Sequence, residues 1–282
     1  MNILQAILLG IIQGLTEFLP ISSTGHLTLA GKFMHLISNQ HPEQWTAFIA
    51  VIQIGTVIAV IIYFWKDIWE IIFDFLNENV KRRVKFSDQK LNSKLGWLII
   101  IGSIPVGVIG LSLKKIIEGT LTKNLYVIAF SLIGLAIILA IAEKAASLKK
   151  DMTKITKWDS FWVGVGQCFA LIPGSSRSGT TITAGLFLGM NRETAARFSF
   201  LLSIPAVLAS GLLELFEARK FLDPSMAVHI IISTIFAFIF GYISIDLLLK
   251  YLRKNTTFVF VYYRIALGII ILILLTSHVI LP

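Results

Sequence analysis

Charged residues and cysteine are both scarce in this chain. Only 15% of its 282 residues are charged and 56% are hydrophobic, whereas a soluble domain carries about 25% charged residues. The single cysteine, Cys168, excludes an internal disulfide and a cysteine-based metal cage. The composition therefore indicates an integral membrane protein, and its apolar runs have the length of helices rather than of barrel strands.

Six apolar runs are long enough to cross the hydrocarbon core as helices. They cover approximately residues 45–65, 95–113, 124–142, 196–214, 226–249 and 259–281. Two further regions, 1–36 and 158–193, are hydrophobic, but a Pro/Ser/Gly segment divides each into arms too short to span. We expect two re-entrant helical hairpins, because irregular backbone at membrane depth is tolerated only where it lines a cavity inside the protein.

The net charge of +9 comes from basic residues in the loops between the spans. Fifteen of the 25 Lys and Arg residues lie in segments 66–94, 143–157 and 250–254. Membrane topology and anionic lipid account for this pattern, so it does not indicate a nucleic-acid partner. The positive-inside rule makes these loops cytoplasmic, so hairpin 1–36 opens from outside and hairpin 158–193 from the cytoplasm.

Opposite topology predicts an inverted repeat within one all-α membrane domain. Residues 1–142 and 143–282 would each contain a hairpin followed by three spans. The run Phe48–Val57 also aligns without gaps with Phe198–Val207. Their offset of 150 is close to the 153 positions between the prolines of the two polar segments. The prediction is that both hairpins meet at a shared site.

Those polar segments are Pro20–His26 (PISSTGH) and Pro173–Gly179 (PGSSRSG). Helices are predicted to begin near Ser22/Ser23 and Ser178/Thr180, and the N–H groups at a helix start favour an anion. Together with Arg177 they would form a cradle for phosphate or diphosphate. Glycines in the segments allow the backbone to approach the ligand closely; they are Gly25, Gly174 and Gly179.

A phosphate cradle alone would not need Glu17 and His26. Gln13 and Glu17 share a helical face, so Glu17 could bind a divalent metal with help from the Gln13 amide oxygen, or act as a general base. Ser23 lies three residues before His26, close enough on a helical turn for a hydroxyl–imidazole pair. With Arg177 stabilising charge, the set fits phosphoanhydride hydrolysis. Gln53, in the middle of a span, is expected to line the cavity or bridge helices.

The run from Gln13 to His26 (QGLTEFLPISSTGH) resembles the first signature of the undecaprenyl-diphosphatase, or bacitracin-resistance, family. The run from Pro173 to Thr181 (PGSSRSGTT) resembles its second signature. The resemblance implies a multi-pass enzyme of the bacterial inner membrane that converts a C55 polyprenyl diphosphate to the monophosphate. This recycles the lipid carrier for peptidoglycan synthesis and confers bacitracin resistance. It also implies a Mg²⁺ or Ca²⁺ requirement and a site facing the periplasm.

Matched by position, the family's catalytic residues are Glu17, Ser23, His26 and Arg177, and its metal ligands are Glu17 and Gln13. The expected substrate-binding residues are Ser22, Thr24, Gly25, Gly174, Ser175, Ser176, Ser178, Gly179, Thr180 and Thr181. Two positions depart from the pattern. Gln13 stands where many members have Glu, and Ile49 stands at a position that is often acidic.

Other interpretations stay open at this point. The serines could simply cap helices, His26 could be structural, and Glu17 and Arg177 could merely neutralise each other. A secondary transporter or flippase for an anionic or lipid-phosphate substrate is the main alternative function, and a homodimer is not excluded. A phosphatidic-acid-phosphatase type is excluded, because the chain contains no Arg-Pro dipeptide.

Overall fold

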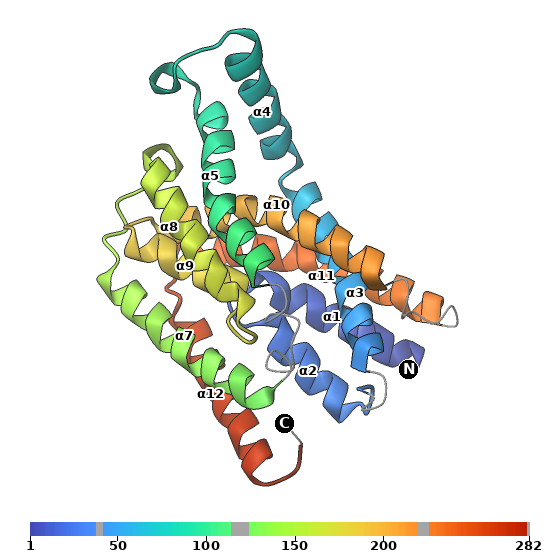
Figure 1. Cartoon of the computed structure of the whole chain (residues 1–282). Coiled ribbons are helices and arrows are strands. Elements are labelled where there is room, and N and C mark those ends of the chain that lie inside the picture. Colours follow the sequence, from blue (N-terminus) through green and yellow to red (C-terminus); the bar gives the residue numbers. More distant parts are fainter. Residues whose placement is uncertain (38–41, 114–123, 219–225, 281–282) are drawn as a thin grey trace.

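The computed structural model describes residues 1–37, 42–113, 124–218 and 226–280 (Figure 1). The first half contains α1 (Ile3–Phe18), α2 (Ser23–Phe33), α3 (Pro42–Tyr63), α4 (Trp65–Leu76), α5 (Leu91–Ser112) and α7 (Leu125–Ala145). The second half contains α8 (Lys157–Cys168), α9 (Arg177–Phe187), α10 (Arg192–Ala218), α11 (Ala227–Leu252) and α12 (Phe258–Thr276). Short single turns are η1 (Asn77–Lys81), η2 (Phe86–Asp88), η4 (Met152–Lys154) and η5 (Phe169–Leu171).

The all-helical membrane fold is confirmed. Among the described residues, α3, α5, α7, α10, α11 and α12 are long and apolar enough to cross a membrane. They correspond to the six predicted spans, although several ends differ. α10 begins at Arg192 rather than 196, because the Asn191 side chain accepts a hydrogen bond from the backbone N–H of Thr194 at 2.8 Å and caps the helix before the apolar run. Residue 281, where the last span was expected to end, lies outside the described residues.

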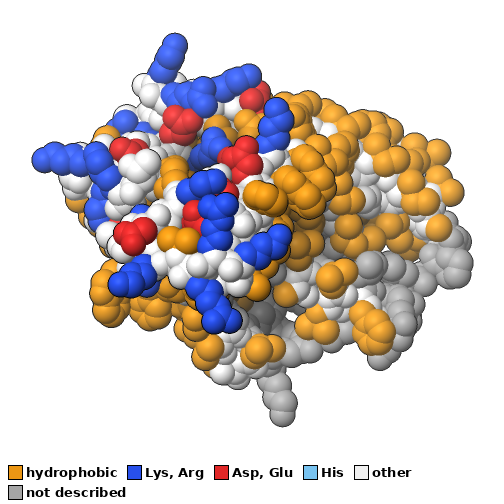
Figure 2. All heavy atoms as spheres, turned by 90° about the horizontal axis from the view of Figure 1, so that it is seen from above, with side chains coloured by type: hydrophobic (Ala, Val, Ile, Leu, Met, Phe, Trp, Pro, Cys, Tyr) orange, Lys and Arg blue, Asp and Glu red, His pale blue; other side chains and the backbone are white. Residues whose placement is uncertain are grey.

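Segment 66–94, which was predicted as a loop, contains α4 and the turns η1 and η2. Charged residues lower its hydropathy, yet its apolar residues follow a helical period. α4 and the start of α5 project beyond the other helices (Figure 1). Viewed from that side, Lys and Arg gather over one part of the surface and apolar side chains cover another (Figure 2).

Each first arm packs on a helix of the opposite half. α1 lies along α11, and α8 lies along α5. The contacts are too close for larger side chains: a Cβ on Gly10 would lie 2.4 Å from the Ser233 carbonyl oxygen, and one on Gly164 would lie 2.1 Å from that of Gly102. The two halves therefore interlock instead of forming separate bodies.

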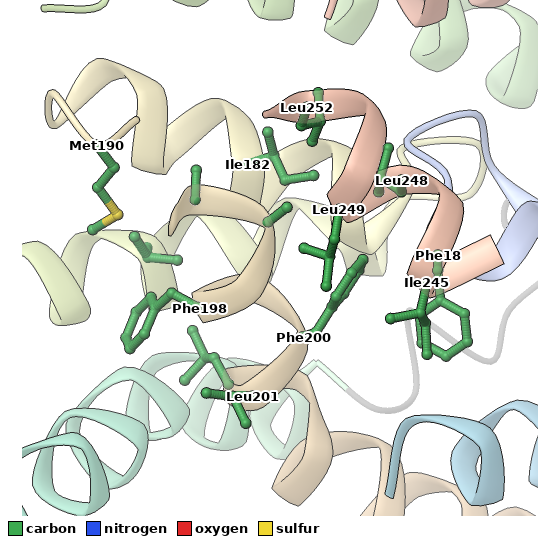
Figure 3. Packing of buried hydrophobic residues seen from close by; sticks show 14 of the residues in the cluster. Phe18, Ile182, Met190, Phe198, Phe200, Leu201, Ile245, Leu248, Leu249 and Leu252 are labelled. Carbon is green, nitrogen blue, oxygen red and sulfur yellow. The ribbon is translucent and has the colours of Figure 1, made fainter. Parts of the chain in front are cut away.

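The largest hydrophobic cluster among the described residues joins side chains of α3, α5, α7, α9, α10 and α11. Figure 3 shows Phe198, Phe200 and Leu201 of α10 packed among residues of α9 and α11. Phe18, the last residue of α1, reaches this cluster and meets Phe200 edge to face at 5.4 Å between ring centroids. The end of α1 is thereby fixed against the second half.

Candidate active site

The two Ser-rich turns have the same local geometry. α1 and α2 are separated by a break at residues 19–22, and α8 and η5 are followed by a second break before α9. Ser22 (φ 75°) caps α2 by accepting the Gly25 N–H at 3.3 Å, and Ser176 (φ 65°) caps α9 by accepting the Gly179 N–H at 3.2 Å. Both serines hold a positive φ that is uncommon for residues other than glycine. The predicted start of α2 is confirmed, whereas α9 begins at Arg177, slightly earlier than expected.

Glu17 lies at the centre of the hydrogen-bond network of the site. Its Oε2 accepts hydrogen bonds from Ser23 Oγ at 2.7 Å and Gln13 Nε2 at 3.1 Å. Its Oε1 accepts one from Gln53 Nε2 at 3.4 Å and pairs with the Arg177 guanidinium. The Glu17 side chain is only 8% exposed. The carboxylate therefore accepts hydrogen bonds from four side chains. Gln53, which was expected to line the cavity or to bridge helices, does both.

The Glu17–Arg177 pair joins the two halves of the chain. Ser178 adds a second link, since its hydroxyl donates to the Leu19 carbonyl at 3.2 Å. The first turn and the second turn are thus in direct contact, as their shared polar chemistry predicted. The ion pair also matches the alternative in which the two charges neutralise each other, so the pair by itself does not establish catalysis.

Both ring nitrogens of His26 have partners other than Ser23. Its Nδ1 lies 2.6 Å from the Ser22 carbonyl oxygen, and its Nε2 lies 2.6 Å from the Tyr263 hydroxyl. A carbonyl only accepts, so in the neutral ring Nδ1 donates and Nε2 accepts from Tyr263. The predicted Ser23–His26 pair is wrong in this structure, because the carboxylate of Glu17 is the stronger acceptor for the Ser23 hydroxyl.

A cavity of about 640 Å³ opens beside the two turns. Its lining includes Gln13, Glu17, Ser22, Ser23, Thr24, Gln53, Gln167, Gly174, Ser175, Ser176 and Arg177, together with Ser103 of α5 and Ser210 of α10, whose hydroxyls donate to backbone carbonyls of their own helices. The opposite wall is largely apolar and includes Val106 and Leu111 of α5 and Pro205 and Ala206 of α10. The cavity can therefore hold a ligand with a polar head and a hydrocarbon chain.

Several predicted binding residues do not line this cavity. Thr180 and Thr181 donate to the Arg177 carbonyl at 3.0 and 2.7 Å, and Thr181 also contacts the Ser199 hydroxyl at 2.5 Å. Ser178 is bonded to the first turn. Gly25, His26 and Gly179 are likewise absent from the lining. These residues shape the turns and the start of α9, whereas Gly174 (φ 86°) does line the cavity, and a Cβ there would lie 2.6 Å from the Ile128 carbonyl oxygen.

Arg264 was missed by the sequence reasoning. It lies in α12, is completely buried, and donates from one terminal nitrogen to the Ser175 carbonyl at 2.9 Å. Ser131 of α7 reaches the same turn, with its hydroxyl 2.9 Å from that of Ser175. An arginine inside an otherwise apolar span was the available signal, because a charge at membrane depth is a functional candidate. Arg264 adds a second positive charge behind the second turn.

The described residues contain no group of three or more His, Cys, Asp or Glu side chains placed to hold a metal. Glu17 supplies a carboxylate, and Gln13, which uses Nε2 towards Glu17, leaves its Oε1 for a cation. Mg²⁺ is commonly held by one or two carboxylates together with substrate phosphates and water. The donor set fits a cation whose coordination the substrate completes.

Comparison with known proteins agrees over nearly the whole chain. A family model described as "Bacitracin resistance protein BacA" matches residues 6–270. A relative from Syntrophobacter fumaroxidans (strain DSM 10017 / MPOB), named undecaprenyl-diphosphatase, is 56% identical over 99% of both chains. Relatives of the same name from Chlorobaculum tepidum and Myxococcus xanthus are 45% and 47% identical, covering 100% and 98% of this chain and 100% and 90% of their own.

Proposed function

Because the chain belongs to the family of the bacitracin resistance protein BacA, it is a membrane-embedded undecaprenyl-diphosphatase, and we propose that hydrolysis takes place in the cavity between its two Ser-rich turns. The observation that carries this proposal is the convergence of Glu17, Ser23 and Arg177 at the polar end of that cavity. The apolar wall suits the first part of the prenyl chain, and the remaining chain would stay in the bilayer.

The proposed chemistry follows from the partners of Glu17. Ser23 Oγ, held at 2.7 Å, gives its proton to the carboxylate and attacks the terminal phosphorus. The bond from phosphorus to the bridging oxygen breaks, Glu17 passes the proton it took to the departing lipid monophosphate and is a carboxylate again, and the phosphoryl group stays on Ser23. Water, activated by Glu17, then cleaves this ester to give inorganic phosphate and restores the serine. Direct attack by water oriented by Glu17 is the alternative route.

Charge stabilisation is assigned to Arg177 and to the N–H groups at the starts of α2 and α9. A divalent cation bound at Glu17 and Gln13 would supply further neutralisation of the phosphate oxygens when present. Binding at Glu17 would also compete with Arg177 for the carboxylate and so free the guanidinium for the substrate. His26, bonded to Ser22 and Tyr263, positions the first turn in this scheme.

The proposal extends to the membrane arrangement. The matching caps at Ser22 and Ser176, and the packing of each first arm on the opposite half, support two re-entrant hairpins in an inverted repeat. The cavity is lined by residues 103–111 of α5, which lie at the end away from the basic segment 81–90. With that basic segment in the cytoplasm, the cavity opens towards the periplasm of the inner membrane.

Phosphate release by the purified protein in detergent tests the function. Undecaprenyl diphosphate should yield inorganic phosphate in Mg²⁺ or Ca²⁺, and excess chelator should abolish the reaction. Glu17→Ala and Arg177→Ala should each lose at least about 100-fold in rate, the scale of losing one charge-stabilising group, while eluting as folded protein. Movement of the lipid across vesicles without phosphate release would overturn the proposal in favour of a flippase.

A nucleophile trap separates the two chemical routes. Brief exposure to substrate labelled in its terminal phosphate should place label on Ser23, and Ser23→Ala should prevent this. Full activity in Ser23→Ala would exclude the serine route and leave attack by water.

A further inference from the structure

Gln167 has a buried side-chain amide beside the second turn. It lies in the last turn of α8, is 1% exposed, and lines the cavity beside the second turn. Neither its Nε2 nor its Oε1 has a hydrogen-bond partner among the described residues. Buried polar atoms are normally paired, so an amide with both atoms unpaired at the wall of a cavity points to a partner that the protein itself does not provide.

The equivalent glutamine in the first half does have a side-chain partner. Gln13 precedes the capping Ser22 by nine residues, and Gln167 precedes the capping Ser176 by the same distance. Gln13 donates to Glu17, four residues further along α1. Four residues after Gln167 stands Leu171, whose side chain offers no acceptor. The second half has therefore kept the glutamine and lacks the carboxylate that would satisfy it.

We propose that Gln167 is a substrate-binding residue whose Nε2 donates to a phosphate oxygen of the lipid diphosphate. A diphosphate has acceptors only, which matches the amide N–H groups. It would lie between Gln167 and Arg177, both of which line the same cavity. The anion then takes the acceptor role that Glu17 fills for Gln13. This inference rests on the proposed function and names one further contact in that site.

A matched control is available in α11. Thr234 has a buried hydroxyl that also lacks a partner among the described residues, but it does not line the cavity. Gln167→Leu and Thr234→Val both replace an unpaired polar group by an apolar group of similar size. Both variants should retain or raise the unfolding temperature, because neither removes a hydrogen bond that the described structure contains.

The two variants should differ in activity and binding. Gln167→Leu should lower kcat/KM for undecaprenyl diphosphate at least about tenfold and weaken a methylene-bridged farnesyl diphosphate analogue comparably, whereas Thr234→Val should match the parent in both. Gln167→Glu, which keeps the size but repels an anion, should weaken the analogue more than Gln167→Leu does. Parental kcat/KM and analogue affinity in folded Gln167→Leu, or tighter binding in Gln167→Glu, would overturn the assignment.

Failure of this inference is distinguishable from failure of the proposed function. An active parent together with an equally active Gln167→Leu variant removes only Gln167 from the site. An inactive parent removes the hydrolase assignment, and the analogue-binding comparison still decides whether Gln167 contacts a diphosphate. If Gln167→Leu does not fold, the affinity of Gln167→Glu for the analogue is compared with that of the parent. Equal affinity would then refute the assignment.

Discussion

Glu17→Gln is expected to improve diphosphate binding while it abolishes hydrolysis. In the structure the Arg177 guanidinium is paired with Glu17, so a phosphate must displace the carboxylate before it can use the same donors. The amide of glutamine keeps the size of the side chain and removes its charge. Both the competition for Arg177 and the direct repulsion between Glu17 and the anion are lost.

The size of the effect follows from the burial of the pair. Two unit charges about 4 Å apart attract by roughly 4 kcal/mol at an effective dielectric of about 20. Glu17 and Arg177 are 8% and 21% exposed, so water screens part of this attraction. The glutamine carbonyl also retains some hydrogen bonding to Arg177. A net release of about 1.4 kcal/mol is a conservative expectation, and this corresponds to roughly tenfold tighter binding.

The assay is titration of a methylene-bridged farnesyl diphosphate analogue into purified protein in detergent with excess chelator. The matched control is Asp67→Asn, which removes the carboxylate from another Arg–carboxylate pair, with Arg197; neither residue lines the cavity. Asp67→Asn should bind like the parent. Added Mg²⁺ should strengthen binding to the parent and not to Glu17→Gln. If Glu17→Gln binds the analogue in excess chelator no more tightly than the parent does, Glu17 does not compete with phosphate for Arg177.

Three further changes test other parts of the structure. Arg264→Met should lower the rate of phosphate release at least about tenfold without unfolding the protein, because the carbonyl of Ser175 loses a charged donor; a parental rate would refute this role. Gly164→Val should reduce the free energy of unfolding by about 3 kcal/mol or more through overpacking against α5. Gly134→Ala, with open space around it in the interior of α7, should not destabilise and should raise the free energy of unfolding by up to about 1 kcal/mol through helix propensity. Burial raises the pKa of Asp159, but hydrogen bonds from Lys150 and Thr156 outweigh it and leave that pKa below its ordinary value. The stability that this group contributes is therefore present above about pH 4 and is lost as the pH falls further. Asp159→Asn should make the free energy of unfolding fall less steeply below that pH.

The spans could be predicted because hydropathy determines them directly. Runs such as 226–249 contain few polar residues, and α11 occupies almost the same positions. α4 could not be found in this way. Its charged residues, Lys66, Asp67, Glu70 and Asp74, hide a helical period from a measure that only averages hydropathy. Helix ends were also inexact, since caps such as Asn191 depend on single polar contacts.

The site was predictable where burial of a charge was itself the signal. Glu17 and Arg177 stood out as ionisable residues at membrane depth, and the structure brings them together. Which side chains would pair with one another was harder to predict from the sequence. Spacing on a helix allowed Ser23 to reach His26, but the tertiary structure places Glu17 closer to Ser23 and Tyr263 closer to His26. Arg264 approaches the second turn from the other end of the sequence, so no local pattern could connect them.

The two turns share one backbone design and differ in chemistry at equivalent positions. Relative to the capping serine, Glu17 corresponds to Leu171 and Ser23 to Arg177. Two carboxylates at the cavity would repel a diphosphate, and two arginines would bind it with no group to take a proton. In the proposed mechanism, the base and the hydroxyl lie in one half of the chain and the guanidinium in the other, which avoids this conflict. The same asymmetry leaves Gln167, at the position equivalent to Gln13, without a side-chain partner among the residues that the structure describes.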